Sequence, residues 1–311
     1  MGLKIGLIGG GFMSGVHRGN LDRDDRVEVC GVYDIDPTRA GALAVASVEE
    51  LLEKSEAVYI VSPNTTHVET ALKALAADRH VFCEKPMATT LEDAQRLHEA
   101  ATASNKVFQV GHNRRFAPVY KQVKQLLEAS PAHCAHIKMN RGELLNPAWV
   151  GDASVTGGFL FETPIHMFDM MRFLMGEIAS VEARESRQDD FSMLVEFESG
   201  IHATFVTSAD TSWFFPYESV EVYGEYSTIR TEEMERIEWR RGLDVPTSVE
   251  NFANLTREEK WGFAEGDRLF VDAILSGGEP PVTSYDGLKS VEMTRAVYRS
   301  AKEKTAVRLE L

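Results

Sequence analysis

The sequence predicts an α/β domain with a parallel sheet, followed by an α+β domain with a mostly antiparallel sheet. Up to about residue 117, short β-branched segments alternate with amphipathic segments, which is the pattern of parallel strands joined by crossover helices. Beyond Pro118, strand-like segments follow one another with few helices between them, which favours antiparallel pairing. We therefore expect two domains, residues 1–117 and 118–311.

Hydrophobic periodicity places the elements of each domain. In the first domain we expect strands at residues 4–8, 27–33, 57–61, 80–83 and 107–110, and helices at residues 11–21, 37–46, 48–53, 67–77 and 90–104. In the second domain we expect strands at residues 133–141, 180–185, 191–198, 202–208 and 219–223, and helices at residues 119–128, 164–175, 266–275 and 287–304. The polar stretch 244–260 is expected to be a long loop.

Composition and charge exclude several classes of protein. The 311 residues include 33 basic and 48 acidic side chains, and the net charge is -15. Such a chain would repel a phosphate backbone, so we expect no nucleic-acid partner. No stretch approaches the roughly 18 apolar residues of a membrane span, and no signal peptide is recognisable. With three scattered cysteines, Cys30, Cys83 and Cys134, we expect a cytoplasmic protein without membrane association.

A glycine-rich turn joins the first strand to the first helix. Residues 9–14, GGGFMS, match the pattern G-x-G-x-x-G with Ser14 in the third place. Gly9 would permit the tight turn, and Gly11 would let the backbone approach a pyrophosphate. The N–H groups of Phe12 and Met13 would then bind its charge at the helix N-terminus. The turn predicts a Rossmann domain, although such a turn can also merely connect a strand to a helix.

Asp34 lies at the end of the second strand, 20 residues after Ser14. A carboxylate there can accept hydrogen bonds from an adenosine ribose, and it would repel the 2′-phosphate of NADP. NAD is therefore the expected cofactor and NADP the less favoured one, although nearby Arg39 weakens this preference. The alternative role, a turn-forming aspartate, suits Asp36 better because it directly precedes Pro37.

Two further segments carry side chains suited to catalysis. Lys85 follows the fourth strand, and ligands bind at the carboxyl ends of parallel strands; the alternative is a solvated lysine. In the second domain, Thr163 suits an N-cap and Pro164 the first helical position, so His166 would lie in the first turn. The helix dipole there disfavours imidazolium and leaves His166 able to accept a proton. Asp169 is at i+3 on the same face, and a buried His–Asp hydrogen bond is the alternative.

A metal site is not expected. His133, Cys134 and His136 are close in sequence, but adjacent strand residues point to opposite faces, as do His133 and His136.

Taken together, these motifs resemble the Gfo/Idh/MocA family of NAD(P)-dependent oxidoreductases, which includes inositol and glucose-fructose dehydrogenases. The resemblance covers essentially the whole chain and rests on the glycine turn with His17, Asp34, residues 62–67 (SPNTTH), residues 84–86 (EKP), residues 111–116 (GHNRRF), Gly157-Gly158, Glu162, His166 and Asp169. It implies a Rossmann domain followed by a domain with a large open sheet, whose outer face commonly forms a dimer or tetramer interface. A homodimer or homotetramer is therefore expected.

The resemblance also implies roles for individual residues. It implies that Lys85 and His166 face the substrate, and that the Lys85–Pro86 bond is cis. It further implies that Asn64, His67, Glu84 and Arg115 line the cofactor or the crevice. With the turn and Asp34, the expected cofactor site comprises Gly9, Gly11, Phe12, Met13, Asp34, Ser62, Asn64, His67, Glu84, Lys85 and Arg115. Glu162 stands where the family often has Asp, and Pro164 where it often has Gly.

We interpret the chain as an NAD-dependent dehydrogenase acting on a secondary alcohol, or the matching ketone, of a sugar, cyclitol or similar polyol. His166 would accept the hydroxyl proton and Lys85 would stabilise the developing alkoxide. Glu162 would orient His166 or a neighbouring hydroxyl, and Asp169 would complete the substrate site. The alternatives are an NAD-dependent glycosidase that oxidises its substrate transiently, and a non-catalytic NAD-sensing regulator of the same fold.

Overall fold

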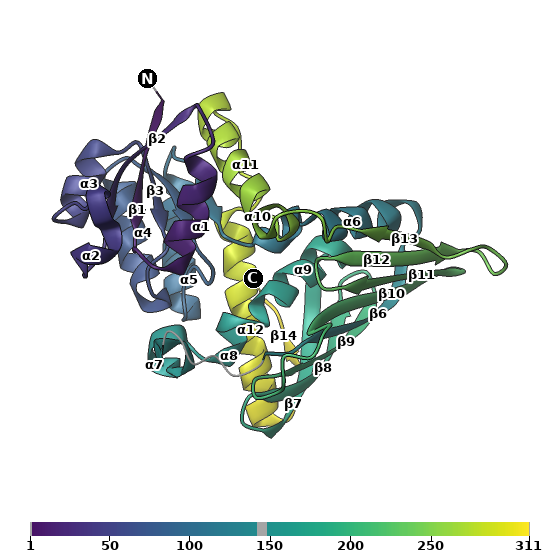
Figure 1. Ribbon diagram of the computed structural model, residues 1–311. Helices are drawn as coiled ribbons and strands as arrows, with labels where there is room; N and C mark the ends of the chain where they lie inside the picture. Colours follow the sequence, from purple (N-terminus) through teal and green to yellow (C-terminus); the bar gives the residue numbers. More distant parts are fainter. Residues whose placement is uncertain (1, 142–147, 311) are drawn as a thin grey trace. The chain divides into compact units, whose positions relative to one another are not determined.

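The computed structural model describes residues 2–141 and 148–310 (Figure 1). The contacts divide the chain into two compact units. Unit 1 comprises residues 1–113, 155–157 and 263–291, and unit 2 comprises residues 114–154, 158–262 and 292–311. The division does not follow a single cut near residue 117, because residues 263–291 pack with the N-terminal sheet.

Unit 1 contains a five-stranded parallel sheet in the order β2-β1-β3-β4-β5. Its strands are β1 (Leu3–Ile8), β2 (Val27–Tyr33), β3 (Ala57–Ile60), β4 (His80–Cys83) and β5 (Phe108–Val110). All four residues of β3 are buried, as expected where helices cover both faces of a sheet. Because β2 and β3 lie on opposite sides of β1, the order reverses there, and ligands bind at such a switch point. The predicted α/β domain is confirmed.

The helices of unit 1 begin largely where capping residues predict. They are α1 (Phe12–Leu21), α2 (Pro37–Ala40), α3 (Val48–Lys54), α4 (His67–Ala76), α5 (Leu91–Ala103) and α11 (Phe263–Ser276), with 3-10 helices η1 (Gly41–Leu43) and η2 (Asn64–Thr66). Thr90 accepts a hydrogen bond from Asp93 N at 3.1 Å and so caps α5. The single helix expected over residues 37–46 is wrong, because Gly41 adopts φ +61° and ends α2.

Unit 2 contains a nine-stranded sheet in the order β13-β12-β11-β10-β6-β9-β8-β7-β14. Its strands are β6 (Ala132–Met139), β7 (Ile178–Arg187), β8 (Asp190–Phe197), β9 (His202–Ser208), β10 (Glu218–Gly224), β11 (Ser227–Glu232), β12 (Arg236–Arg241), β13 (Ser248–Asn251) and β14 (Val307–Arg308). Only the β6–β9 pair is parallel among these pairings. The predicted, mostly antiparallel sheet is therefore confirmed.

Helices cover one face of this sheet (Figure 1). The remaining helices of the described chain are η3 (Asn113–Phe116), α6 (Pro118–Ala129), η4 (Ala148–Gly151), α7 (Ala153–Thr156), α8 (Phe159–Glu162), α9 (Ile165–Met175), α10 (Arg257–Lys260) and α12 (Ser284–Glu303). Helices α7 and α12 each contain a boundary between the two units. Phe168 of α9 meets Phe205 of β9 with ring centroids 5.7 Å apart. Alternate residues of β8 are buried, so this face forms the core of unit 2.

The long loop expected over residues 244–260 is partly wrong. Residues 248–251 form β13, and residues 257–260 form α10, whose capping box pairs Thr256 with Glu259. Strand β13 has four exposed residues and no alternation, so nothing in its hydrophobic pattern announces a strand. It exists because its backbone pairs with β12.

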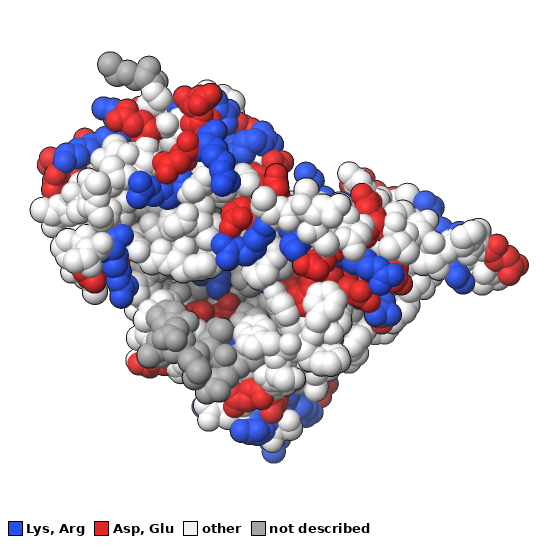
Figure 2. All heavy atoms as spheres, in the orientation of Figure 1, with Lys and Arg blue, Asp and Glu red and all other residues white. Residues whose placement is uncertain are grey.

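Acidic and basic side chains lie next to one another on the face shown in Figure 2. Exposed ion pairs of the described residues include Lys54 with Glu50 and Arg299 with Glu303. Basic side chains therefore pair locally with acidic ones, although the chain as a whole has a net charge of -15. None of the described helices is long and apolar enough to cross a membrane.

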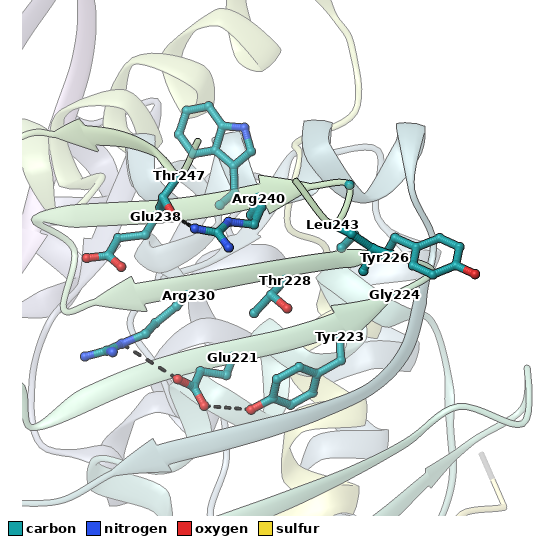
Figure 3. Close-up of a pocket in the computed structure, with 13 residues that line it drawn as sticks. Glu221, Tyr223, Gly224, Tyr226, Thr228, Arg230, Glu238, Arg240, Leu243 and Thr247 are labelled. Atoms are coloured by element: carbon teal, nitrogen blue, oxygen red, sulfur yellow. Dashed lines mark hydrogen bonds and ion pairs between the residues drawn. The ribbon is translucent and has the colours of Figure 1, made fainter. Parts of the chain in front are cut away.

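The other face of the nine-stranded sheet carries a shallow hollow of about 670 Å³ over β10, β11 and β12. Figure 3 shows its charged and aromatic side chains projecting from these strands, with Glu221 between Arg230 and Tyr223. Tyr223 donates a hydrogen bond to Glu221 at 2.8 Å. This face is thus polar with scattered aromatic groups, unlike the apolar face beneath α6 and α9.

Candidate functional site

The glycine turn lies between the carboxyl end of β1 and α1. Gly9 has φ +109°, and a side chain on it would approach Val61 O to 2.7 Å, so glycine is required there. A side chain at Gly11, in contrast, would meet no described atom within 4 Å. The space beside the N-terminus of α1 is therefore open, and its N–H groups and dipole suit a pyrophosphate.

Asp34 follows β2 and its carboxylate turns back to the glycine turn. One oxygen accepts a hydrogen bond from Gly10 N at 2.6 Å, and the other accepts one from Asp36 N at 2.8 Å. Each carboxylate oxygen keeps a second lone pair that a ribose hydroxyl could use. Arg39 forms an exposed ion pair with Asp36 at 3.6 Å. The residues of this turn therefore fit the adenosine and pyrophosphate parts of a dinucleotide.

Residues after β3 form the next part of this edge of the sheet. Ser62 is partly exposed, and its hydroxyl lies 2.7 Å from Thr66 Oγ1. Asn64 is 6% exposed and donates to Thr156 O at 3.0 Å. His67 is almost fully buried, with Nδ1 2.8 Å from Pro86 O and Nε2 2.8 Å from Ser62 O. His67 thus joins the loop after β3 to the loop after β4.

Burial disfavours the charged form of His67, and it lowers the pKa of the imidazole despite the two nearby carbonyl groups. A neutral imidazole has one N–H donor, so only one of the two carbonyl contacts is a conventional hydrogen bond. His67 is therefore a neutral side chain that holds the two loops together through its contacts with Pro86 O and Ser62 O.

Lys85 lies at the carboxyl end of β4, directly after buried Glu84. The side chain of Lys85 is partly buried, and the Lys85–Pro86 bond is cis, as the resemblance implied. Glu84 folds back so that its Oε2 accepts the backbone N–H of Lys85 at 3.0 Å. A side chain at Gly111 would lie 2.9 Å from the Glu84 carboxyl carbon, so Gly111 allows the carboxylate to pack flat against the backbone.

His17, for which no individual role was expected, lies next to Glu84 in the structure. His17 Nε2 lies 3.1 Å from Glu84 Oε1, and His17 Nδ1 lies 2.7 Å from Asp267 Oδ1. All three side chains are buried. His17 and Asp267 are 250 residues apart, so no local pattern could reveal the pair.

In unit 2, Glu162 ends α8 and His166 lies in the first turn of α9. Both side chains are partly exposed. The expectation that Thr163 caps this helix is wrong: α9 begins at Ile165, and Pro164 occupies the N-cap without a side-chain hydrogen bond. Thr163 is instead the C-cap of α8, because its N–H donates to Phe159 O at 3.2 Å.

Asp169 is 1% exposed and forms a bidentate ion pair with Arg115. Arg115 Nε donates to Oδ2 at 2.8 Å, and its Nη2 donates to Oδ1 at 2.6 Å. Both carboxylate oxygens are therefore engaged by one guanidinium, which is the strongest geometry for such a pair. The structure brings together two residues that the sequence had assigned separately to cofactor and substrate.

A second buried ion pair neighbours this one in sequence. Arg114 contacts the fully buried Glu218 through Nε and Nη2, at 3.0 and 2.7 Å to Oε2. Tyr120 donates to the other oxygen of Glu218 at 2.7 Å. Consecutive arginines thus anchor η3 to two different elements, β10 and α9.

Potential metal ligands do not gather in the described part of the chain: no group of three or more His, Cys, Asp or Glu residues there could hold an ion.

The fold and the turn define a class of protein, a dinucleotide-binding oxidoreductase with a Rossmann domain and an α+β domain. Two family models match the chain: an oxidoreductase family model with an NAD-binding Rossmann fold over residues 3–112, and the corresponding C-terminal alpha/beta domain over residues 131–309. The chain belongs to the Gfo/Idh/MocA family, as its motifs indicated. It is an NAD(P)-dependent dehydrogenase acting on CH–OH groups.

Several known proteins are similar over nearly their whole length. Inositol 2-dehydrogenase 3 of Saccharopolyspora erythraea is 30% identical, over 92% of this chain and 89% of its own. Myo-inositol 2-dehydrogenase of Thermotoga maritima is 25% identical, over 99% of both chains. The structure of levoglucosan dehydrogenase with NADH and levoglucosan has a TM-score of 0.91 at 20% identity, covering 100% of both chains. That last likeness concerns the fold.

Proposed function

We propose that the protein transfers a hydride between NAD(H) and a secondary alcohol or ketone of a sugar, cyclitol or similar polyol. The observation that carries this proposal is the position of Lys85: a partly buried cation at the carboxyl end of β4, in the same sheet whose β1 leads into the open glycine turn. Relatives named inositol dehydrogenases support the class of substrate.

The chain's own side chains supply acid–base chemistry and orientation. When bound, the nicotinamide accepts or donates the hydride. Lys85 would donate a hydrogen bond to the substrate oxygen and stabilise the negative charge that develops on it. His166 would accept the hydroxyl proton at a ring nitrogen, a contribution of roughly 10²- to 10⁴-fold. Glu162, four residues earlier, would orient His166 or an adjacent substrate hydroxyl.

The cofactor we propose is NAD in preference to NADP. Asp34 places a carboxylate beside the turn, and Arg39 is already paired with Asp36. A 2′-phosphate would therefore meet an anion without a fully available cation. The further residues proposed to hold the cofactor are Gly9, Gly11, Phe12, Met13, Ser62, Asn64 and Lys85, and Glu84 contributes to this site by fixing the backbone of Lys85.

His67, Arg115 and Asp169 act one step further away in this proposal. His67 supports the loops after β3 and β4, and Arg115 holds Asp169 within α9. Because the carboxylate of Asp169 is nearly inaccessible, we propose that it fixes the first turns of α9, and with them His166, rather than binding substrate directly.

Self-association through the outer face of the nine-stranded sheet is also proposed. Leu194, Val206 and Tyr223 expose 40%, 41% and 38% of their surface on β8, β9 and β10. The hollow in Figure 3 adds polar and aromatic groups on the same sheet. Exposed apolar side chains on a broad sheet suit the interface of a homodimer or homotetramer.

The free cysteines Cys30, Cys83 and Cys134 suit the reducing cytoplasm, where we propose that the protein is located.

The proposal is tested with a panel of sugars, cyclitols and their keto forms, assayed with NAD or NADH through the absorbance of the reduced cofactor. We expect turnover with at least one polyol–ketone pair in both directions. Glycoside cleavage without net change in the cofactor, or cofactor binding without turnover on any member of the panel, would overturn it.

A further inference from the structure

We propose that His17 is a positioning residue for Lys85, which it controls by clamping the Glu84 side chain against the Lys85 backbone. The inference rests on the proposed function, in which Lys85 contacts the substrate oxygen. It adds a buried cluster, formed by His17, Glu84 and Asp267, whose hydrogen bonds reach the backbone N–H of Lys85.

The cluster has a defined hydrogen-bonding pattern. His17 lies between two carboxylates, at 2.7 Å from Asp267 and 3.1 Å from Glu84. Carboxylates only accept, so both ring nitrogens of His17 must donate, and the imidazole must be protonated. Asn20 donates to the second oxygen of Asp267 at 2.7 Å. Each short contact thus has a donor and an acceptor.

Burial and charge act in opposite directions on His17. Burial disfavours its cation, but the charges and hydrogen bonds of Asp267 and Glu84 outweigh burial and raise the pKa of His17 to about 10. Burial also disfavours the charged form of Glu84, which by itself would raise the pKa of this carboxyl group. The hydrogen bonds and charges of His17 and Lys85 outweigh burial, and the pKa of Glu84 is lowered. The charged groups facing the cluster are Asp267 from α11, Glu84 and Lys85 from the end of β4, with Tyr59 of β3 beside Asp267.

The geometry transmits this arrangement to Lys85. Glu84 uses one oxygen for His17 and the other for the N–H of Lys85, at 3.0 Å. Gly111 closes the remaining side of the carboxylate. If His17 is replaced, one buried oxygen of Glu84 loses its hydrogen-bond donor. An unpaired buried carboxylate is unfavourable, so the Glu84 side chain is expected to rotate or to take up a proton. The backbone of Lys85 then loses its fixed acceptor.

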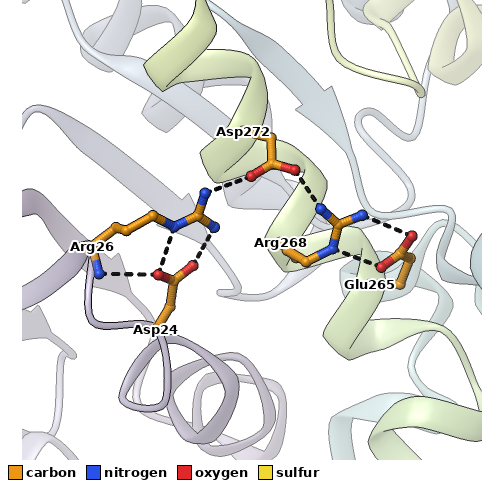
Figure 4. Close-up of polar contacts among 5 residues, drawn as sticks. All are labelled: Asp24, Arg26, Glu265, Arg268 and Asp272. Atoms are coloured by element: carbon orange, nitrogen blue, oxygen red, sulfur yellow. Dashed lines mark hydrogen bonds and ion pairs between the residues drawn. The ribbon is translucent and has the colours of Figure 1, made fainter.

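The helix that supplies Asp267 is itself anchored. Figure 4 shows a chain of ion pairs in which Asp272 of α11 lies between Arg26 and Arg268, with Asp24 and Glu265 at the ends. Arg26 meets Asp272 at 2.7 Å, which joins the loop before β2 to α11. In the core, the rings of Tyr59 and Phe82 pack on Phe270 of α11. The cluster therefore rests on rigid elements, as a precise site requires.

The test uses the full chain without cofactor and measures hydrogen exchange at the Lys85 amide, with the Val81 amide of β4 as internal reference. Val81 N bonds to Val107 O at 2.9 Å and lies outside the cluster. In His17→Gln we expect the Lys85 amide to exchange at least about tenfold faster while Val81 is unchanged. In Asp267→Asn, which keeps an acceptor for His17 but removes a charge, we expect a smaller acceleration.

Kinetics provide the second readout. His17→Gln should lower kcat by roughly 10- to 100-fold, because small displacements of a catalytic group have effects of this size. KM for NADH and its affinity by fluorescence titration should change by less than about threefold. The matched control is Ser55→Ala, which removes the buried hydrogen bond from Ser55 to Leu51 O in unit 1 without touching the cluster. It should leave kcat and the Lys85 amide as in the parent.

The outcomes separate the two proposals. Parent-like exchange at Lys85 in a folded His17→Gln protein would overturn the positioning role, whatever the activity. Should His17→Gln not fold, Asp267→Asn decides: parent-like exchange there overturns the role, and accelerated exchange supports it. Suppose that Lys85→Ala has the kcat of the parent, while hydrogen exchange at the amide of residue 85 still accelerates in His17→Gln. The proposed catalytic function of Lys85 would then be wrong, and the positioning of its backbone by His17 and Glu84 would be supported.

Discussion

At the scale of single residues, Asp34 determines the proposed choice of cofactor. Its oxygens already accept two backbone N–H groups, so its position is fixed before a ribose arrives. Asp34→Asn, which keeps an acceptor but removes the charge, should bring the affinities for NAD and NADP closer together by roughly tenfold. Isothermal titration calorimetry with both cofactors measures this. A parent protein that binds NADP as tightly as NAD would show that Arg39 outweighs the carboxylate.

His166 carries the second prediction at this scale. If it accepts the hydroxyl proton, turnover in the oxidation direction should rise with pH through one ionisation, because only neutral imidazole accepts a proton. Turnover against pH at saturating cofactor should show this limb in the parent and lose it in His166→Ala. Glu162→Gln should retain the limb, because in this proposal Glu162 orients the base and does not itself accept the proton. A limb that persists unchanged in His166→Ala would assign the base to another group.

Single residues also show which positions a local sequence pattern can predict and which contacts it cannot. Gly9 and Asp34 directly follow β1 and β2, and Lys85 follows β4 after Glu84, so the sequence could place all three at one edge, because parallel strands bring their carboxyl ends together. The role of His17 could not be predicted, because Asp267 reaches it from a helix 250 residues away. The pairing of Arg115 with Asp169 escaped for the same reason, at a separation of 54 residues.

At the scale of elements, the turn between β11 and β12 contains a carboxyl group with an unusual titration. Burial, followed by the charge of Glu218, raises the pKa of Glu233 to about 7, although N–H groups of Tyr217 and Glu218 partly oppose this. The folded protein therefore holds this proton more tightly than the unfolded chain does. Parent stability should fall as pH rises from about 4.5 to about 7, and the loss should persist above that window.

Glu233→Gln removes this titration. We expect the variant to match the parent near pH 4.5 and to exceed its free energy of unfolding by on the order of 1–2 kcal/mol above pH 7. Urea unfolding at several pH values measures the difference. A gap that does not change with pH would mean that Glu233 titrates normally in the folded protein.

Elements with strong periodicity were predicted with nearly the observed bounds, and elements held by partners were not. Strands β2, β4 and β9 match their predicted ranges because each is rich in β-branched or apolar residues. Strand β12, with sequence RIEWRR, lacks a clear alternation and pairs on both sides with β11 and β13. Its formation depends on neighbours that a local pattern does not contain.

At the scale of the whole molecule, the broad outer sheet face is the proposed interface between copies of the chain. Replacing Leu194 and Val206 together by Glu should convert the parent dimer or tetramer into single chains, because two charges would be buried without partners. Sedimentation analysis measures the mass. Leu275→Glu, which alters a 52% exposed leucine of unit 1, is the control and should keep the parent's mass. A parent that sediments as a single chain would contradict the proposed interface.

The two-unit architecture was predicted from the change of pattern after Pro118, since helix-linked strands and consecutive strands form different kinds of sheet. The return of residues 263–291 to unit 1 was not predicted, because a helix pattern shows which face is apolar and does not show which sheet that face will cover.

The central claim is that Lys85 belongs to the reacting centre of a dehydrogenase that uses NAD. The most direct measurement compares the parent with Lys85→Ala for kcat on the polyol identified by the panel and for NADH affinity by fluorescence titration. We expect a loss of kcat of at least about 100-fold, with NADH affinity within about threefold of the parent's, because the lysine stabilises charge that appears only in the transition state. Near-parent kcat in Lys85→Ala would contradict the catalytic role and make Lys85 an ordinary solvated lysine.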